Sequence, residues 1–403
     1  MKTRGLESQI LVLVTLGLVA FGLVMVYSAT SAAAALGGDD PSEFLKRQGT
    51  YALLGLGLLI AASRFDFRRL RPLAPSLLVA SFGLCVAVLV LAQPVNGARR
   101  WLQLGPATFQ PSELAKLGFC VWAAAYLARK TPPQTLGELA KPLGLVLGLL
   151  GAVILVEPDL GTTISLFLTA AALLLVANVP ARVLGTAAGL TMTLGALAIW
   201  LEPYRRERLL SFLDPWQDAQ GSGFQIVQAQ IGLGSGGFLG EGLGQGVQKI
   251  HYLPEAHTDM ILAIIGEELG LVGTAAVILA YALFAWAGLR IALSCRDAFG
   301  KHLAAGLVAL VCGQAAINLM AVLGLAPLTG IPLPFVSYGG SNLVVQLASV
   351  GILLNVAANG RVAASVPDRG RRDGRTRAAG ARGRGRAAGA RRPRDVRRVA
   401  GAG

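Results

Sequence analysis

Residues 252–273 read YLPEAHTDMILAIIGEELGLVG, a polar turn that passes directly into an apolar stretch with two adjacent glutamates. Proline and polar residues ahead of an apolar run predict a loop that ends where a helix begins. The run from 260 to 290 can cross a hydrocarbon core of about 30 Å, so we expect a membrane-spanning helix there. Asp259 would then lie at the N-terminal end of this helix, with Glu267 and Glu268 deeper along it.

The remainder of the chain has the composition of a polytopic membrane protein. Of its 403 residues, 54% are hydrophobic and 14% are charged, and long apolar runs recur at spacings that suit a bilayer. We therefore predict an all-α fold of about ten membrane-spanning helices within residues 1–360. The predicted helices are 9–30, 49–63, 73–93, 111–128, 142–157, 160–179, 182–201, 260–290, 303–324 and 341–358.

The net charge of +14 is concentrated in the C-terminal tail, residues 361–403, which holds 14 arginines against three aspartates. This tail has almost no large apolar side chains, so it cannot bury enough surface to offset the entropy of ordering. We expect a disordered cytoplasmic tail attracted to anionic membrane lipids, and no nucleic-acid partner.

The orientation follows from the basic residues, most of which fall on alternate loops that belong to one face. By the positive-inside rule that face is cytoplasmic, and an even number of spans places both termini there. A large extracytoplasmic loop, residues 203–258, is then expected between the seventh and eighth spans. Five arginines on the exported face run against the rule, and binding an anionic partner would explain them. They are Arg99, Arg100, Arg205, Arg206 and Arg208.

The long extracytoplasmic loop has features of a functional segment, because long ordered loops tend to carry function. Phe224, Val227 and Ile231 recur at helical spacing and predict a short amphipathic helix at the outer interface. Ten glycines lie between Gly221 and Gly246. They allow either close approach of a ligand or simply tight turns, and spacing alone leaves both interpretations open.

The end of this loop, PEAHTD, brings together Glu255, His257, Thr258 and Asp259. A carboxylate in the first turn of a helix interacts favourably with the helix dipole, so Asp259 could be a structural cap residue. The same placement keeps a carboxylate at the membrane surface, where it could accept a proton from a hydroxyl group. The residues alone support both roles.

Further ionisable residues lie within the predicted spans. Glu113 and Lys116 are three residues apart and share a helical face, so they form either a buried pair or the wall of a polar cavity that opens outward. For Glu267 and Glu268 we expect hydrogen-bonded packing, because charged groups in spans normally face the interior with a partner.

Six segments, in order and spacing, carry a family resemblance: NGARRWLQLG, FQPSELAK, EPDLGT, RLLSFLDPWQDAQGSGFQ, YLPEAHTDMILAIIGEELG and GIPLPFVSYGGS. Over about residues 9–358 the chain resembles the SEDS family of FtsW, RodA and SpoVE. The resemblance implies a peptidoglycan glycosyltransferase that polymerises lipid II outside the cytoplasmic membrane. The loop sequence after the seventh span resembles the division member FtsW more than the elongation member RodA.

The resemblance also implies roles for individual residues. Asp259 matches the family's essential aspartate and would act as general base on the sugar hydroxyl that attacks the donor. A diphosphate leaving group needs positive charge, which exported arginines and a divalent cation (Mg or Mn) could supply. We expect the substrate-binding residues to be Glu113, Lys116, Arg47, Arg99, Arg100, Gln110, Ser112, Glu255, His257, Thr258, Ser337 and Ser341. His251 stands where some relatives carry an acidic residue, so a second carboxylate role there is doubtful.

The expected partners are the lipid II substrate, a single-span class B penicillin-binding protein that crosslinks the strands, and other membrane proteins of the division machinery. Two other classes of protein fit the same features. A lipid II flippase is one, because many carriers combine such spans with buried carboxylates and broken segments. A scaffold that recruits and activates its penicillin-binding partner is the other.

Overall fold

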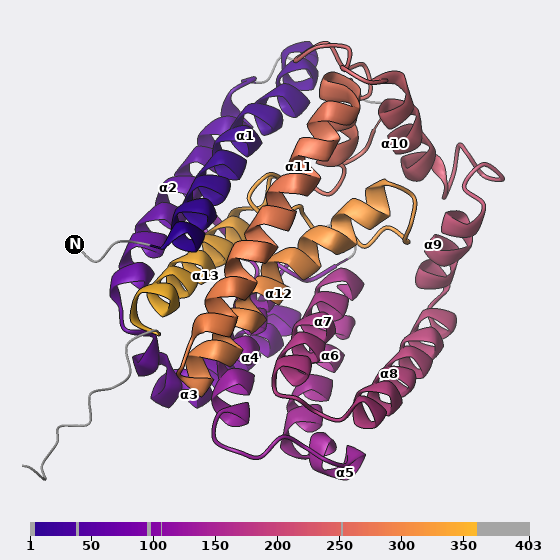
Figure 1. Ribbon diagram of the computed structural model, residues 1–403. Helices are drawn as coiled ribbons and strands as arrows, with labels where there is room; N and C mark the ends of the chain where they lie inside the picture. The colour runs from indigo at the N-terminus through magenta and orange to yellow at the C-terminus, as the bar shows by residue number, and fades with distance from the viewer. Residues whose placement is uncertain (1–4, 38–39, 95–97, 106, 251–252, 361–403) are drawn as a thin grey trace, which may run out of the picture. The chain divides into compact units, whose positions relative to one another are not determined.

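The computed structural model describes residues 5–37, 40–94, 98–105, 107–250 and 253–360, and these form a largely helical bundle (Figure 1). The helices of the first half are α1 (Leu6–Gly37), α2 (Glu43–Arg64), η1 (Phe67–Arg69), α3 (Leu70–Leu91), α4 (Pro111–Leu127), α5 (Leu136–Leu139), η2 (Ala140–Gly144), α6 (Leu145–Val156) and α7 (Leu160–Val176). Those of the second half are α8 (Ala181–Leu201), α9 (Pro203–Leu213), α10 (Phe224–Ser235), α11 (Ile261–Ser294), α12 (Ala298–Val322) and α13 (Gly340–Asn359). Between α3 and α4, β1 (Leu102–Leu104) pairs antiparallel with β2 (Ala107–Phe109), and Gln103 lies opposite Thr108.

Each of the ten predicted helices has a counterpart, so the all-α prediction is confirmed. Seven helical segments of the described residues are long and apolar enough to cross a membrane, and α7 is a shorter apolar helix. Helices α2 and α4 are continuous, but charged side chains near their N-termini, among them Arg47 and Lys116, shorten their apolar stretches. The number of ten spans therefore stays a prediction.

The interior is formed mainly by α4, α12 and α13. Most residues of α4 (14 of 17) and α12 (18 of 25) are buried, including polar ones such as Lys116 and Gln314. The helices α2 and α13 lie side by side, and a Cβ atom on Gly351 would come within 2.4 Å of the Leu59 carbonyl oxygen. Small residues at such positions let helix backbones approach closely, as is usual in membrane bundles.

Helix α8 lies at the edge of the bundle and continues into α9 (Figure 1). Of its 21 residues only Val183 is buried. An apolar helix that packs so little against protein is expected to face lipid. The polar helix α9 follows the end of this span directly, so α9 begins where the chain leaves the hydrocarbon region.

Helix α11 is the counterpart of the predicted span 260–290, but it is not one continuous helix. Gly270 has φ +65° and ψ −158°, a conformation that glycine adopts readily and that breaks the helix. The chain folds back at this point, because a Cβ atom on Gly266 would lie 3.4 Å from Thr274 Oγ1. In a straight helix these two residues would be about 12 Å apart along the axis. The first leg, 261–269, precedes the longer leg 271–294.

The glycine-rich segment 237–242 closes this break. The backbone N–H groups of Leu271 and Val272 donate to Gly237 O and Phe238 O (3.0 and 3.3 Å). Two N–H groups of the same segment, at residues 241 and 242, donate to the carbonyl oxygens of Glu267 and Glu268 (3.0 Å each). A helix end leaves such groups without intrahelical partners, so the segment satisfies both ends that meet at Gly270.

The predicted loop 203–258 contains two helices, α9 and α10. The short helix predicted from Phe224, Val227 and Ile231 is present as α10, but its buried side chains include Ile226 and Val227, whereas Ile231 is 42% exposed. The packed face is therefore rotated from the predicted one. The tail 361–403 and His251 lie outside the described residues.

Candidate active site

Asp259 lies in the turn that leads into α11, and main-chain contacts fix its position. Asn318 of α12 donates through Nδ2 to the carbonyl oxygens of Asp259 (2.7 Å) and Ile331 (2.9 Å). Two residues earlier, His257 O accepts a hydrogen bond from the N–H of Tyr338 (2.9 Å). The turn is thereby held between the end of α12 and the segment 323–339.

The interpretation of Asp259 as a helix cap is not supported by this geometry. Helix α11 begins at Ile261, and its N-cap residue is Met260, which makes no side-chain capping hydrogen bond. The one side-chain donor to Asp259 is the hydroxyl of Thr258, at 3.3 Å, among the contacts between described residues. That hydroxyl also lies 3.0 Å from a carboxylate oxygen of Glu255.

The Asp259 side chain is partly accessible, and it forms no ion pair within the described part of the chain. Desolvation, followed by the nearby charge of Glu255, raises the pKa of Asp259 to about 6, and Arg208 of α9 opposes this shift. A carboxylate with this pKa is mostly ionised at pH 7, yet it binds a proton more readily than an ordinary surface aspartate.

A hollow of about 300 Å³, within the size range of small-molecule sites, borders the turn that carries Asp259. Arg208 lines it and donates to Leu328 O (3.4 Å). Pro254, five residues before Asp259, lines the same hollow, and Gln225 Nε2 donates to its carbonyl oxygen (3.3 Å). The turn before Asp259 and Arg208, which interacts electrostatically with Asp259, therefore border a space lined with both polar and apolar groups.

His257 belongs to an aromatic cluster on the other side of the turn. Its ring lies 4.8 Å from Phe44 and 5.5 Å from Tyr338, measured between centroids. Burial lowers the pKa of His257, although the charge of Glu255 opposes the shift, so the ring is neutral at pH 7. Arg47 is one turn beyond Phe44, is 57% exposed, and pairs with Glu43 at 2.6 Å.

Glu113 and Lys116 form a fully buried pair with an Oε1 to Nζ distance of 2.9 Å. Lys116 also donates to Gln314 Oε1 (2.7 Å), and Asn342 donates to Glu113 Oε2 (2.8 Å). Gln314 in turn donates to Pro332 O (2.9 Å). The geometry agrees with the buried-pair interpretation and links α4, α12, α13 and the segment 323–339. The side chains reach no surface, so direct substrate binding by either one stays a prediction.

Four other predicted binding residues lie near α4 or in the segment 323–339, and two of them, Gln110 and Ser341, connect backbone segments near the start of α4. The N–H of Gln110 donates to Ser341 Oγ (3.0 Å), which donates to Thr108 O (3.1 Å). Gln110 Nε2 donates to Asp159 Oδ2 (3.0 Å). Ser337 Oγ accepts from the N–H of Leu333 (2.8 Å). Ser112 is fully buried, and its hydroxyl has no partner among the described residues.

The predicted arginines Arg99 and Arg100 contact backbone carbonyl groups. Arg99 donates to Leu89 O (2.9 Å), and Arg100 donates to Glu157 O (3.0 Å) and Pro158 O. These bonds tie the segment before β1 to α3 and to the link between α6 and α7. Contact with a substrate anion would require these side chains to exchange partners.

No cluster of three or more His, Cys, Asp or Glu side chains suited to a metal ion occurs in the part of the chain that the structure describes. Mg²⁺ commonly uses only one or two carboxylates together with substrate phosphates and water. Asp259 and Glu255, which interact electrostatically, are chemically suited to such a partial set. The predicted divalent cation remains a prediction.

Sequence reasoning overlooked two residues of this site. Among the described residues, Asn318 donates the one side-chain hydrogen bond to the Asp259 backbone, and an amide inside an apolar helix could have indicated it. Arg208 stood among the arginines that oppose the charge rule, but nothing in the sequence separated it from its neighbours. Its electrostatic interaction with Asp259 joins residues 51 positions apart, and only the folded chain shows it.

Comparison with known proteins identifies related sequences. A family of cell cycle proteins, designated FtsW, RodA and SpoVE, matches residues 8–362. A "Probable peptidoglycan glycosyltransferase FtsW" of Geobacter metallireducens is 40% identical over 351 residues, which cover 86% of this chain and 94% of the relative. Stage V sporulation protein E of Bacillus subtilis is 39% identical over 358 residues, covering 87% of this chain and 97% of the relative.

Two solved structures have the same fold. One belongs to work described as "Structural coordination of polymerization and crosslinking by a peptidoglycan synthase complex"; it matches with a TM-score of 0.72 and 32% identity, and covers 86% of this chain and 96% of that chain. The other is the rod shape determining protein RodA of Thermus thermophilus, with a TM-score of 0.66 and 30% identity over 88% of this chain and 97% of that chain.

Proposed function

Because the chain belongs to the FtsW, RodA and SpoVE family of cell cycle proteins, we propose that Asp259 is the general base of its glycosyltransferase reaction. The chain is a multi-pass membrane protein and a peptidoglycan glycosyltransferase that polymerises lipid II for the cell wall, in the division role of FtsW. The observation that supports the role of Asp259 is its partly accessible carboxylate, which forms no ion pair within the described residues and belongs to a turn that borders a hollow.

In this mechanism Asp259 accepts the proton of the GlcNAc 4-hydroxyl of one lipid-linked disaccharide. The hydroxyl oxygen attacks the anomeric carbon of MurNAc on the donor, undecaprenyl diphosphate leaves, and the new β-1,4 bond has inverted configuration. The pKa of about 6 supports this role, because a general base works best when its pKa lies near the operating pH. Asn318 fixes the backbone of Asp259 and so orients the carboxylate.

The leaving diphosphate requires positive charge as the bond breaks. Arg47 suits this task, because its side chain is largely exposed and only an exposed carboxylate neutralises it, a contact that is worth little in water. Arg99 and Arg100 are secondary candidates that would have to leave their carbonyl partners. A divalent cation, if bound with the substrate phosphates, would supply further positive charge.

The remaining predicted residues act through the segments they connect. Glu113 and Lys116 hold Gln314 and, through it, Pro332, while Ser337 closes the turn at Leu333. Both contacts order the segment that packs against the Asp259 turn. Gln110, Ser112 and Ser341 lie where β2 meets α4 and α13, and Thr258 and His257 flank the base itself.

The active site belongs on the extracytoplasmic face, with both termini in the cytoplasm, because the basic loops fall on the opposite side. A class B penicillin-binding protein is the expected partner. The similarity to a component of a complex that coordinates polymerisation with crosslinking supports such an assembly.

A reconstitution experiment tests the proposal. The purified chain, combined with its penicillin-binding partner and labelled lipid II, is expected to produce glycan polymer, and Asp259→Asn is expected to abolish polymer without loss of the complex. Polymer from the Asp259→Asn variant would remove Asp259 as the base. Transfer of lipid II between leaflets without polymer would identify a carrier, and full cell-wall synthesis in cells carrying the variant would identify a scaffold.

A further inference from the structure

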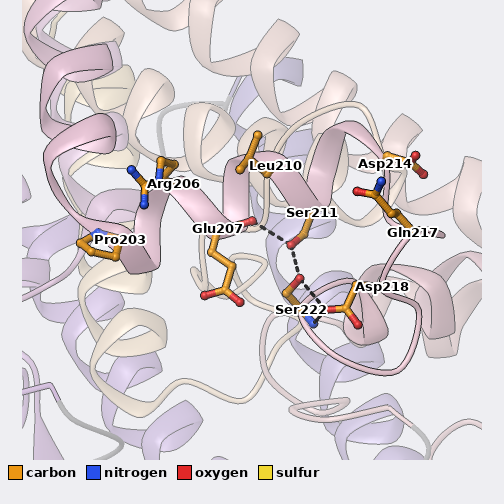
Figure 2. A pocket seen from close by; sticks show the side chains of 9 residues that line it. All are labelled: Pro203, Arg206, Glu207, Leu210, Ser211, Asp214, Gln217, Asp218 and Ser222. Atoms are coloured by element: carbon orange, nitrogen blue, oxygen red, sulfur yellow. Dashed lines mark hydrogen bonds between the residues drawn. The ribbon is translucent and has the colours of Figure 1, made fainter.

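A second hollow, of about 390 Å³, lies along α9 and shares Glu207, Ser211 and Ser222 with the hollow beside Asp259. Figure 2 shows the side chains that line it, including Arg206, Asp214, Gln217 and Asp218. Ser211 Oγ donates to Ser222 Oγ (2.6 Å), and both serines line both hollows. Together the hollows form a groove that begins at Pro254, in the turn that carries Asp259, and follows α9.

The charges of the groove exclude some ligands. Three carboxylates line it, from Glu207, Asp214 and Asp218, against the two cationic side chains Arg206 and Arg208. Arg206 lies 5.7 Å from the ring centroid of Trp200. A diphosphate would meet an excess of negative charge here, so the groove does not suit the leaving group.

A neutral chain of sugar rings matches the same lining. Carboxylates accept hydrogen bonds from hydroxyl groups, and amides and hydroxyls such as Gln217, Gln225 and Ser222 both donate and accept. Pro254 and Leu328 add apolar surface at the end near Asp259. The groove also follows α9, which begins where the lipid-facing α8 ends. A ligand bound in the groove would therefore extend from the membrane boundary toward water.

We propose that this groove holds the saccharide chain of the growing glycan strand, an inference that rests on the proposed polymerase function. Both lipid-linked reactants must keep their isoprenoid ends in the bilayer, and the growing strand alone has sugar units that extend beyond the reacting pair. Binding these units keeps the strand beside Asp259 between successive couplings. The groove residues thus determine how many sugars are added before the strand is released.

The test measures strand length. In the reconstituted complex with labelled lipid II, the double variant Asp214→Asn with Gln217→Ala is expected to shorten the mean strand about fivefold, as expected for the loss of hydrogen bonds to a ligand. The shortening is expected to exceed any fall in the rate of the first coupling. Gln220→Ala is the matched control, because Gln220 is exposed on the same loop and lines neither hollow. An unchanged strand length in the double variant would overturn the proposal.

A binding measurement keeps the proposal testable if the double variant does not fold. Saturation-transfer NMR would follow a soluble GlcNAc–MurNAc tetrasaccharide, free of lipid and peptide and with its lactyl carboxyl groups amidated so that it is neutral, on full-length protein carrying Asp259→Asn to prevent turnover. We expect binding that Gln217→Ala weakens and Gln220→Ala leaves intact. Equal binding by both variants, or no binding to the Asp259→Asn protein, would contradict the groove assignment. Polymerisation by the Asp259→Asn protein would instead contradict the proposed base, so the two failures are distinguishable.

Discussion

Asp259 and Glu268 lie near opposite ends of the first leg of α11, and their surroundings differ in every respect. Glu268 is fully buried, and its oxygens accept hydrogen bonds from Ser28 Oγ (2.8 and 2.7 Å) and Lys249 Nζ (2.6 Å). Asp259 is partly accessible, has one hydroxyl donor at 3.3 Å and forms no ion pair in the described part of the chain.

The difference separates a structural carboxylate from a reactive one. A buried charge with a cation and a hydroxyl around it is stabilised as an anion and has little tendency to take up a proton. A carboxylate that is desolvated and forms no ion pair with the nearby cation keeps much of its affinity for protons. Within nine residues the chain therefore carries one group suited to packing and another suited to proton transfer.

The largest effect is expected when Asp259 loses its charge. Asp259→Asn should lower the polymerisation rate by about 10²–10⁴-fold, the usual contribution of a general base. Stability at pH 7 should not fall, because the folded-state pKa of about 6 lies above the ordinary value of 3.8, and ionising such a group costs folding free energy as the pH rises between the two values. Polymerisation assays and thermal unfolding in detergent measure the two quantities. If Asp259→Asn lost activity only because it unfolds, Asp259 would be a structural carboxylate like Glu268.

Breaking the buried pair of Glu268 and Lys249 should instead lower the stability of the protein. Glu268→Leu leaves Lys249 charged and buried, which is expected to cost about 3–5 kcal/mol of unfolding free energy. The double variant Glu268→Leu with Lys249→Met removes both charges and should recover much of this loss. Thermal unfolding of the single and double variants measures the coupling between the residues. If the double variant is no more stable than the single one, the loss in the single variant does not come from an unpaired buried charge on Lys249.

A smaller effect is expected on the pH dependence of polymerisation, which tests whether Asp259 is the titrating group. Asp259 must be ionised to accept a proton, so activity should rise with pH through about 6 and be lost below it. Glu255→Gln removes the charge that raises the pKa of Asp259 and should move this rise to lower pH. Arg208→Gln should move it to higher pH, each shift being less than about one unit. Shifts of the same sign in both variants would show that Asp259 is not the titrating group.

The smallest effect is expected at an exposed pair. Arg47 and Glu43 lie 2.6 Å apart with about half of each side chain exposed, and surface pairs contribute about 0–1 kcal/mol. Glu43→Gln should therefore change the midpoint of thermal unfolding only slightly. It should also strengthen diphosphate binding, because Arg47 loses its competing partner. A large loss of stability would show that this pair resembles the Glu268 pair rather than a solvated one.

The sequence predicted the helices well because apolar length is a local property. All ten predicted helices have counterparts, and the i, i+3 spacing of Glu113 and Lys116 correctly indicated a possible pair. The expected hydrogen-bonded packing of Glu267 and Glu268 is also present: Glu267 accepts from the N–H of Val247 (2.7 Å). Each of these outcomes depends on helix geometry or on the cost of burying charge.

The features that sequence could not provide depend on distant residues. Nothing around Gly270 distinguishes it from glycines that continue a helix, because the segment 237–242 that satisfies the broken ends lies elsewhere in the chain. Ser28 is 240 residues from Glu268. The groove along α9 requires the loop after that helix to fold back onto it, and hydropathy carries no information about this packing.

The reversal at Gly270 also reconciles α11 with the thickness of a bilayer. Drawn straight, its 34 residues would be about 51 Å long, far more than the hydrocarbon thickness of about 30 Å. Folded back, the leg 271–294 measures about 36 Å, which a modest tilt accommodates. The excess length becomes a return segment of about 13 Å that carries the Asp259 turn away from Gly270. How far the base lies from the outer end of its own span is therefore set by the number of residues in that segment.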